Sequence, residues 1–443
     1  MNNNSRNTFK KEIRGMPRLL LRMPNSNVLM FGSIKGDFSA DDLKKAVRKL
    51  PDNHQFLKCR IKFDNDDNAF YTIDRTLILP VINAESCDMK EVVKNELKYL
   101  FDFEKEPLVR ITLVKENKET FLVVNCHHTI CDGMSLVYLF KDIMQNLANR
   151  NNEEKYIPSE PVFFEQKNVS QKEGNFFTHL FSGIINWKWK RKHVAFSRET
   201  YRSIHHGFWN EHMPEMCCFS FSEKQSQEII SKCREHGIKV NTALTTALLQ
   251  TEKMVLEDEE YSDKVTIAVN IRDSLTKKPE ESIGYFATAI RPQLKYSGDK
   301  AFLENALIFQ KEISKMLSGN LFKSLAINLI DTKFLDSIVL NKFGKRNDKM
   351  ARKFIKKTMM DEINTTFTVS NLGLLEIPTE YGPLELKTLY GPIIYSDTME
   401  KYIGILTING KIHLSICYDE NIIGTGSINK IKNILNSKTT FQL

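Results

Sequence analysis

Two adjacent histidines, His127 and His128, begin a short segment, HHTICDG, that ends with Asp132 and Gly133. A neutral imidazole accepts a proton from a hydroxyl, an amine or a thiol near pH 7, because its ordinary pKa of about 6.5 lies close to that pH. We therefore regard His128 as a candidate general base. Asp132 would either orient this histidine or hold the segment in place through an ion pair with an arginine elsewhere in the chain. Gly133 tolerates positive φ and would let the backbone turn sharply.

The same residue types also occur where a strand ends without any catalytic role. Taken alone, a pair of histidines and an Asp-Gly turn fit ordinary surface or core groups better than a catalytic site. A metal site is disfavoured as well, because neighbouring side chains on an extended strand end point to opposite sides and do not readily bind one ion. The interpretation therefore depends on the elements on either side of the segment.

The segment lies between a predicted buried strand and a predicted amphipathic helix. Residues 121–126 are apolar nearly throughout, which is typical of a strand covered on both faces. The strand before it, 109–113, alternates apolar with polar positions, so that one face is buried. After Gly133 the apolar period becomes that of a helix. The apolar face of this helix comprises Leu136, Phe140, Ile143 and Leu147.

Other periodic segments predict a mixture of helices and strands along the whole chain. Ser39 caps a helix that ends near Pro51. Asn409-Gly410 is the strongest hairpin turn signal, between strands at 402–408 and 411–418. The other predicted strands are 56–63, 69–73, 265–271 and 363–370, and the other predicted helices are 89–99, 222–236, 241–254 and 428–435.

The composition excludes several classes of protein. With 443 residues, of which 41% are hydrophobic, 10% aromatic and 27% charged, the chain can bury a substantial core, which excludes a disordered, collagen-like or disulfide-stapled protein. Eight cysteines are scattered without metal-ligand spacing and are expected to be free thiols. The net charge of +8 is moderate and spread, as on a solvated surface, and leaves a docking site for a phosphorylated carrier or cofactor open. No nucleic-acid partner is expected.

The sequence carries no sign of membrane insertion or secretion. No apolar run approaches the ~18 consecutive residues that a spanning helix needs. Residues 1–30 lack the apolar core and the cleavage site of a signal peptide. A cytoplasmic protein without a transmembrane segment is expected.

Residues 149–210 are polar, charged and aromatic with little period, and they are the expected domain boundary. Within them, 176–189 could form an amphipathic helix with a basic end. Packing of this helix onto the protein's own surface is favoured over contact with a membrane or an acidic partner.

The segment HHTICDG resembles the HHxxxDG motif of an acyltransferase superfamily. This superfamily includes chloramphenicol acetyltransferase, nonribosomal peptide condensation domains, alcohol acetyltransferases, wax ester synthases and the plant BAHD enzymes. Further segments that resemble the family are 36–50, 53–60, 269–272, 283–286 and 370–373. The resemblance implies an α/β fold, an α+β two-layer sandwich, in which two chloramphenicol-acetyltransferase-like lobes form a V with a central channel. The lobes would comprise residues 1–165 and 211–443, joined by an irregular surface segment, 166–210.

The resemblance also implies a role for each motif residue. His128 would deprotonate an acceptor that enters from one mouth of the channel, while an acyl thioester enters from the other, and would then donate the proton to the leaving thiolate. Asp132 would pair with Arg272 as a structural ion pair. His127 and Gly133 would support the loop.

Two further residues are candidates for stabilising the oxyanion. Ser370 and Asn371 resemble the SN pair that lines the channel in the alcohol acetyltransferase and wax ester synthase branches, and they would donate hydrogen bonds to the tetrahedral intermediate. Alternatively, they would only end a strand before a glycine turn. Cys131 lies inside the motif, but a thiol nucleophile needs an adjacent base and the family uses none there, so that a packing role is expected.

The resemblance implies an enzyme that moves an acyl group from acyl-coenzyme A, or from a phosphopantetheinyl carrier protein, to a hydroxyl or an amine. No metal and no permanently bound cofactor would take part. The DFGWG segment of the BAHD branch is absent, which argues against that branch, and the absence of adenylation and carrier-protein domains favours a free-standing enzyme. Two fused lobes would already build one complete channel, so that a monomer is expected. The alternative is a non-catalytic condensation-like domain that recruits partner proteins.

Overall fold

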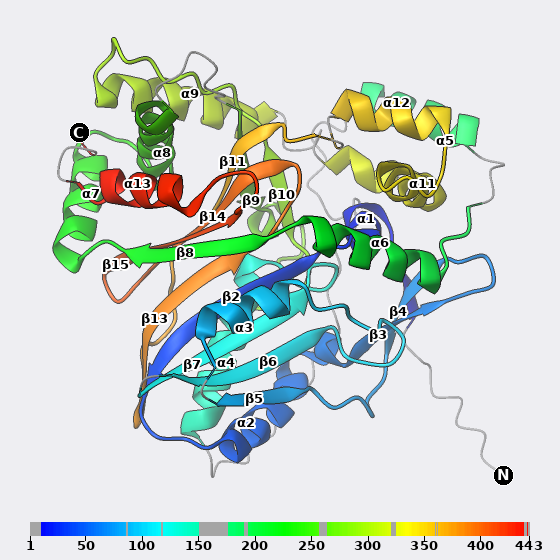
Figure 1. Cartoon of the computed structure of the whole chain (residues 1–443), viewed down its shortest axis with the longest axis horizontal. Helices are drawn as coiled ribbons and strands as arrows, with labels where there is room; N and C mark the ends of the chain where they lie inside the picture. Colours follow the sequence, from blue (N-terminus) through cyan, green and yellow to red (C-terminus); the bar gives the residue numbers. More distant parts are fainter. Residues whose placement is uncertain are drawn as a thin grey trace.

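The computed structural model describes most of the chain. It covers residues 10–85, 87–116, 118–149, 176–189, 194–256, 264–319, 325–358, 360, 362–437 and 441. Parts of the predicted boundary segment, residues 150–175 and 190–193, lie outside the described residues. Figure 1 shows the described elements as two large sheets with helices around them.

The first large sheet holds the motif strand in its middle. In the described ranges it consists of β12 (Glu380–Tyr381), β13 (Leu384–Ile393), β2 (Asn27–Lys35), β7 (Glu119–His127), β6 (Val109–Glu116) and β5 (Val81–Glu85), in this spatial order. Helices α2 (Ala40–Asn53) and α4 (Gly133–Ala148) pack on one face, and α3 (Met89–Leu97) packs on the other. The prediction that the motif strand is covered on both faces is confirmed, because Leu122 and Val124 pack with α4 while Val123 packs with α3.

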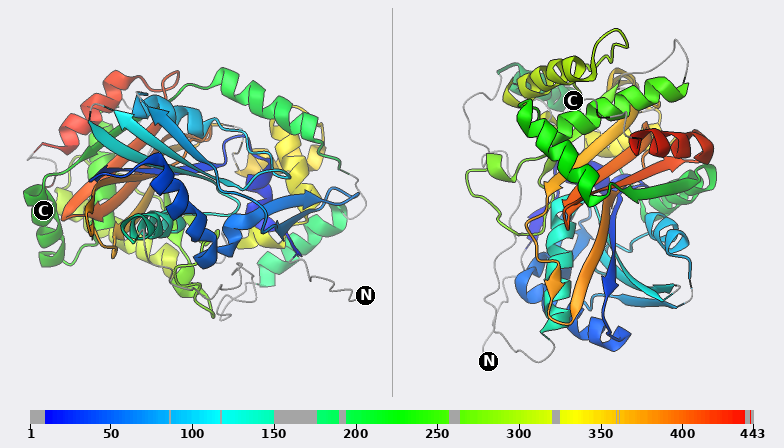
Figure 2. Two further views of the ribbon diagram at one scale, coloured as in Figure 1. Left: turned by 90° about the horizontal axis from the view of Figure 1, so that it is seen from below. Right: turned by 90° about the vertical axis from the view of Figure 1, so that its left-hand side faces the viewer.

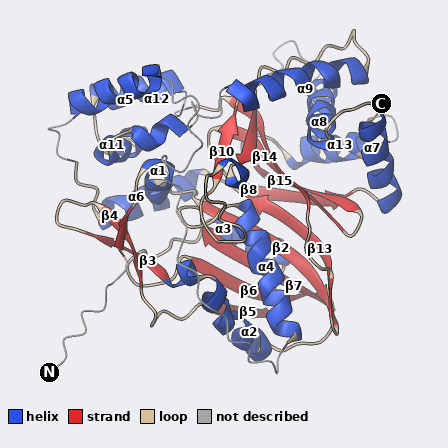
Figure 3. Ribbon diagram, turned by 180° about the vertical axis from the view of Figure 1, so that it is seen from behind, coloured by secondary structure: helices blue, strands red, loops and turns tan. Residues whose placement is uncertain are grey.

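The second large sheet is built in the same way from the second half of the chain. Over the described residues its order is β10 (Ala287–Ile290), β9 (Val265–Asn270), β11 (Thr365–Leu374), β14 (Met399–Ile408), β15 (Lys411–Asp419) and β8 (Pro214–Ser220). Its core is shared with α7 (Glu223–Glu235), α8 (Val240–Leu256), α9 (Phe302–Gly319) and α13 (Thr425–Leu435), seen from behind in Figure 3. The predicted hairpin is confirmed, since β14 and β15 pair up to Ile408 and Lys411 and both turn residues, Asn409 and Gly410, have positive φ.

The two sheets are not formed by separate halves of the chain. After β11 the chain leaves the second sheet, and β13 pairs antiparallel with β2 of the first sheet before β14 returns. This exchange is visible in Figure 1, where the orange β13 lies beside the blue β2, and from two further sides in Figure 2. Residues of the predicted lobe 211–443 thus complete the sheet of the predicted lobe 1–165. The lobe boundaries and the V shape stay predictions.

A helical part of the molecule lies beside the two sheets. It contains α1 (Gly15–Arg22), α5 (Phe176–Trp189), α11 (Thr332–Lys342), α12 (Lys349–Thr358) and the 3₁₀ turn η4 (Leu325–Leu329). A small sheet of β1 (Lys10–Glu12), β4 (Ala69–Ile73) and β3 (Cys59–Phe63) adjoins it. The Arg18 Nε donates to the Asp336 carboxylate at 2.9 Å, and this fully buried ion pair joins α1 to α11.

Some elements differ from their sequence-based expectations. Residues 55–58 form a 3₁₀ turn, η1 (Gln55–Lys58), so that the strand expected from residue 56 begins only at Cys59. The second half of the expected irregular segment is the helix α6 (Arg198–Glu211), which Ser197 caps by accepting from the Thr200 N–H at 3.1 Å. Its aromatic and histidine-rich sequence has low intrinsic helix propensity, so that burial of its apolar face stabilises it instead. Among the described helices, none has both the length and the apolar character that crossing a membrane requires.

Candidate active site

The motif loop is held between the end of β7 and the start of α4. The backbone N–H of His128 donates to the carbonyl of Ser26 at 2.7 Å. At the other end, the Asp132 carboxylate accepts from the backbone N–H of Ser135 at 2.9 Å and caps α4. The predicted loop between strand and helix is confirmed, and hydrogen bonds fix both of its ends.

The side chain of His128 is held in the tautomer that suits a base. Its Nδ1 lies 2.6 Å from the backbone carbonyl oxygen of Cys131. A carbonyl oxygen only accepts hydrogen bonds, so that Nδ1 carries the proton and Nε2 is the basic atom. The ring of Tyr285 packs against the imidazole nearly edge-on, with the ring centroids 5.1 Å apart. Together these contacts hold the imidazole in one orientation.

Burial lowers the pKa of His128 below its ordinary value. Loss of water disfavours the charged imidazolium, and this effect outweighs the hydrogen bond to Cys131 and the charge of Asp132, which both act in the opposite direction. At neutral pH the imidazole is therefore uncharged and able to accept a proton.

His127 points into the core of the first sheet. Its Nδ1 accepts from the backbone N–H of Thr129 at 3.3 Å, and its ring lies edge-on to Phe101 and Phe103. Burial lowers the pKa of His127 to about 3, so that it is neutral in the folded protein. These contacts place His127 behind the loop, in a supporting position.

Asp132 is the centre of a buried ion pair between the two sheets. Its carboxylate accepts from Arg272 Nη1 at 2.7 Å and from Arg272 Nη2 at 3.0 Å. It also accepts from the Ser135 hydroxyl at 2.8 Å and from the backbone N–H of Phe286 at 3.0 Å. Arg272 lies just after β9, so that the pair joins the start of α4 to the second sheet. The predicted pairing of Asp132 with Arg272 is present in the structure.

The pairing with Arg272 keeps the Asp132 carboxylate ionised and hydrogen-bonded. Burial by itself would raise the pKa of Asp132, but the Arg272 guanidinium and the hydrogen bonds from Ser135 lower it overall. Of the two roles considered for Asp132, holding the loop fits the geometry, because the Nδ1 of His128 bonds the Cys131 carbonyl and not this carboxylate.

Glycine at position 133 relieves close packing rather than providing a positive φ. Gly133 is not among the glycines with positive φ, since it is the first residue of α4. A Cβ atom here would lie 3.0 Å from the Leu372 side chain and 3.1 Å from the Pro392 side chain. The expectation of a positive-φ turn is therefore wrong, and glycine makes room for two side chains from the second half of the chain.

The candidate oxyanion donors on β11 point in different directions. Ser370 lines a cavity between the two large sheets and is in hydrogen-bond contact with Tyr402. The Asn371 side chain instead accepts from the backbone N–H of Gly373 at 2.8 Å, and it is not among the described residues that line the cavity. Successive side chains of a strand point to opposite faces. The structure therefore brings Ser370 to the cavity but not Asn371, and a role for either residue in stabilising the oxyanion stays a prediction.

A cavity of about 350 Å³ brings the motif together with the second sheet. His128 borders it from the first sheet and Ser370 from the second, while residues of α1 and η4 close a third side. Its apolar lining includes Met16, Leu20, Met23, Ala268, Ala289, Ile327, Ile394 and Met399. Of the described residues that line it, Asp132 alone carries a full charge at neutral pH, and Arg272 neutralises that charge. The cavity therefore suits uncharged groups.

Three cavity residues received no role from the sequence. Tyr285 contacts His128, Tyr402 contacts Ser370, and Thr368 places a buried hydroxyl at the cavity that has no hydrogen-bond partner in the described part of the chain. A bound substrate that supplies this partner would gain affinity, because an unpaired buried hydroxyl is costly. Nothing in the period of β11 distinguishes Thr368 from its neighbours, whereas Tyr285 lies in a segment that resembles the family.

Cys131 is fully buried, and its Sγ donates to the backbone carbonyl of Asp132 at 3.4 Å. Burial raises the pKa of this thiol well above its ordinary value, which disfavours the thiolate that a nucleophile requires. All eight cysteines are free thiols, as predicted. Across the described ranges, no group of three or more His, Cys, Asp or Glu side chains could hold a metal ion.

Comparison with known proteins indicates the family to which the chain is similar. Residues 24–320 match the family model of the condensation domain. Bacitracin synthase 1 from Bacillus licheniformis is 22% identical over 255 residues, which are 53% of this chain and 4% of that protein. The chain thus spans only a small share of the curated relatives it matches.

Solved structures share the fold over almost the whole chain. The TRI3 trichothecene 15-O-acetyltransferase from Fusarium sporotrichioides has a TM-score of 0.66 and 11% identity, over 100% of this chain and 97% of that chain. The first condensation domain of the CDA synthetase has a TM-score of 0.64 and 9% identity, over 99% of each chain. The predicted α/β fold of this superfamily is confirmed.

Proposed function

Because the chain belongs to the condensation-domain family, we propose that it transfers an acyl group from a thioester to a hydroxyl or an amine, with His128 as the general base. The observation that supports this most directly is the state of His128. Its Nδ1–H donates to the Cys131 carbonyl, its pKa is lowered by burial, and its side chain borders a largely apolar cavity between the two sheets, where the only charged lining residue described, Asp132, is paired with Arg272. A neutral base at such a place is what acyl transfer to a protonated nucleophile requires.

The proposed reaction is direct. Nε2 of His128 takes the proton of the acceptor as the acceptor atom attacks the thioester carbonyl carbon. The tetrahedral intermediate then collapses, the carbon–sulfur bond breaks, and the imidazolium returns the proton to the leaving thiolate. Negative charge develops on the carbonyl oxygen in between, and the Ser370 hydroxyl is the proposed hydrogen-bond donor to it. Asp132 and Arg272 act on the loop rather than on the reacting atoms.

The cavity limits the chemistry of the substrates. Its neutral, largely apolar lining supports an uncharged acyl group, with the Thr368 hydroxyl available to a polar atom on that group. The proposed donor is an acyl group on the phosphopantetheinyl arm of a carrier protein, as in the condensation domains that the motif resembles, and acyl-coenzyme A is the second candidate. A monomer in the cytoplasm stays the expectation for the protein itself.

A non-catalytic role in recruiting partner proteins is the less favoured function. A domain that only recruits partners has no need of a neutral base at a cavity wall or of a fully bonded carboxylate behind it. Both are present here, in His128 and Asp132.

The proposed function is tested by thiol release on the purified full chain. Acyl-carrier proteins and acyl-coenzyme A thioesters are offered in parallel with mixed hydroxyl and amine acceptors, and the products are identified by mass spectrometry. Thiol release that depends on the acceptor and yields an ester or amide would support the proposal and identify the donor class. Absence of release from both donor classes would overturn it in favour of the recruiting role.

The pH dependence of the reaction follows from the pKa of His128. The base acts only when neutral, so that the rate is constant at higher pH and falls as the pH decreases through this pKa. Because burial lowers the pKa, we expect the midpoint of the acid limb of kcat/KM below the ordinary value of about 6.5. Initial rates measured at each pH test this expectation, and circular dichroism verifies that the protein stays folded. A midpoint above the ordinary pKa value in folded protein would contradict the expectation.

The Cys131→Ala variant is expected to keep most of its acyl-transfer rate. The thiol is buried and its pKa is raised, so that it contributes packing rather than a nucleophile. We expect a loss of stability of about 1 kcal/mol, the common size for a single buried substitution. Steady-state kinetics and thermal denaturation measure the two effects. Complete loss of rate in a folded variant would show that the thiol takes part in the reaction.

A further inference from the structure

An exposed apolar stripe runs along α5. Leu180, Ile184 and Trp187 are 48%, 45% and 74% exposed, and their spacing places them on one face of the helix. The other face is anchored in the protein, where Ile185 and Trp189 are 6% and 1% exposed. Packing onto the protein's own surface, the favoured expectation for this helix, therefore accounts for one of its faces only.

A basic helix packs on the same element of the helical part as α5 does. Five exposed side chains of α12 are cations, and the helix contains no carboxylate. These cations are Lys349, Arg352, Lys353, Lys356 and Lys357. Both helices pack on the same residue of α11, since the Phe334 ring lies 4.9 Å from Trp189 of α5 and 5.6 Å from Phe354 of α12. Figures 1 and 3 show α5 and α12 together in the helical part of the molecule, away from the two large sheets.

We propose that this α5–α12 surface, formed by the three apolar residues of the stripe and the five cations of α12, docks onto an anionic lipid bilayer. Tryptophan and aliphatic side chains on one helix face insert at the level of the lipid headgroups. Lysine and arginine beside them pair with lipid phosphates, and their long stems allow the charges to reach the headgroup layer. A single narrow apolar stripe with the exposed Lys188 beside Trp187, and with the cations of α12 in the same helical part, has the chemistry of a surface that lies in the membrane interface.

The α5–α12 surface lies next to a wall of the central cavity. Asn186 of α5 donates to the Leu329 carbonyl of η4 at 2.8 Å and accepts from the Asp331 N–H at 2.8 Å. Two other residues of η4, Ile327 and Asn328, line the cavity. Docking through this surface would therefore hold the cavity beside the bilayer.

The test is flotation of the full chain with vesicles of phosphatidylcholine, with and without phosphatidylglycerol. The wild type is expected to bind the phosphatidylglycerol vesicles, less so as salt is raised. One variant removes the stripe, and a control removes exposed apolar side chains elsewhere. The stripe variant is Leu180→Ser/Ile184→Ser/Trp187→Ser, and its control is Ile78→Ser/Leu374→Ser/Ile422→Ser.

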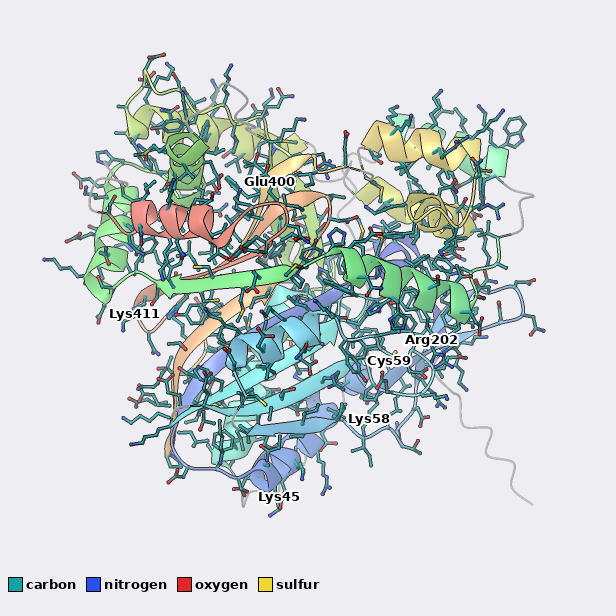
Figure 4. All side chains as sticks on the ribbon, in the orientation of Figure 1. Lys45, Lys58, Cys59, Arg202, Glu400 and Lys411 are labelled. Atoms are coloured by element: carbon teal, nitrogen blue, oxygen red, sulfur yellow. The ribbon has the colours of Figure 1, made fainter. Side chains whose placement is uncertain are left out.

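A second pair of variants tests the charges. The first member reverses three cations of α12, and its control reverses three exposed cations on other helices, among them Lys45, labelled in Figure 4 at the far end of the molecule from α12. The α12 variant is Lys349→Glu/Lys353→Glu/Lys356→Glu, and its control is Lys45→Glu/Arg48→Glu/Lys224→Glu. We expect the stripe variant and the α12 variant each to lower vesicle binding by about tenfold or more. Both controls are expected to bind nearly as the wild type does.

The outcomes separate a bilayer from other partners. Absence of wild-type binding, or equal losses in variants and controls, would overturn the proposal. Full vesicle binding by the stripe variant would also overturn the proposal, because binding that does not need the apolar residues is what a purely ionic site for an acidic protein would give. The thiol-release rate with soluble substrates and the thermal midpoint are expected to stay unchanged in the stripe variant, which shows that binding and not folding or chemistry was altered.

Discussion

The His128→Ala variant is expected to lose about 10²–10⁴-fold in kcat for acyl transfer, which is the usual contribution of a general base. The imidazole borders an existing cavity, so that its removal enlarges this space and leaves the core of the first sheet packed. The variant is therefore expected to fold. Thiol release under saturating donor and acceptor measures the effect, and circular dichroism verifies the fold.

Two controls make this result specific. His206→Ala removes an exposed imidazole on α6 and is expected to keep the wild-type rate. Added imidazole is expected to restore part of the rate of His128→Ala, because it can occupy the vacated space and supply the same base. A folded His128→Ala variant with the wild-type rate would exclude this residue as the base. Lost activity that no concentration of imidazole restores would indicate a positioning role instead.

The Asp132→Asn variant is expected to lower stability by about 3–5 kcal/mol, because it leaves the buried Arg272 without its counter-charge. The carboxylate accepts hydrogen bonds from both Nη atoms of Arg272, from the Ser135 hydroxyl and from two backbone N–H groups. It therefore joins the start of α4 to the second sheet. Loss of acyl transfer is expected to follow from this destabilisation. The midpoint of denaturant unfolding measures the loss of stability.

An exposed ion pair gives the matched control. Asp273 pairs with Lys278 at 2.8 Å on the surface, and Asp273→Asn is expected to cost less than about 1 kcal/mol. The double variant Asp132→Asn/Arg272→Met is expected to regain part of the stability, since no uncompensated charge remains buried. If Asp132→Asn is as stable as Asp273→Asn, the pair does not hold the two sheets. If it is also inactive, Asp132 acts in the reaction itself.

Local signals in the sequence located the loop correctly. The change from the apolar run of 121–126 to a helical period after Gly133 depends only on neighbouring residues, and the structure places β7, the loop and α4 there. The Ser39 cap and the Asn409-Gly410 turn are likewise local, because a side chain or a positive φ within a few residues satisfies them. These features could be predicted because no distant segment changes them.

The walls of the cavity could not be predicted in this way. β13 joins a sheet whose other main strands come from the first half, and α1 closes the cavity although no residue pattern marks it as a wall. Thr368 and Ser370 face the cavity while Asn371 does not, which depends on how β11 lies beside its partners. Such placements follow from pairing between distant segments, and a single sequence does not encode that pairing in any local period.

The sequence by itself determined where the candidate site of this protein lies, because the residue types and their spacing from His127 to Gly133 suffice to place His128 at the end of a buried strand, and the resemblance of this segment to a known motif suggested its role. Only the tertiary structure decided the state of the residues at this site. The tautomer of His128 depends on the turn of the loop back to the Cys131 carbonyl, and the charge of Asp132 depends on Arg272, 140 residues away. Glycine at position 133 relieves tight contacts with side chains from the far end of the chain. Hydrogen bonds, burial and close packing are properties of atoms in space, and folding alone brings these atoms together.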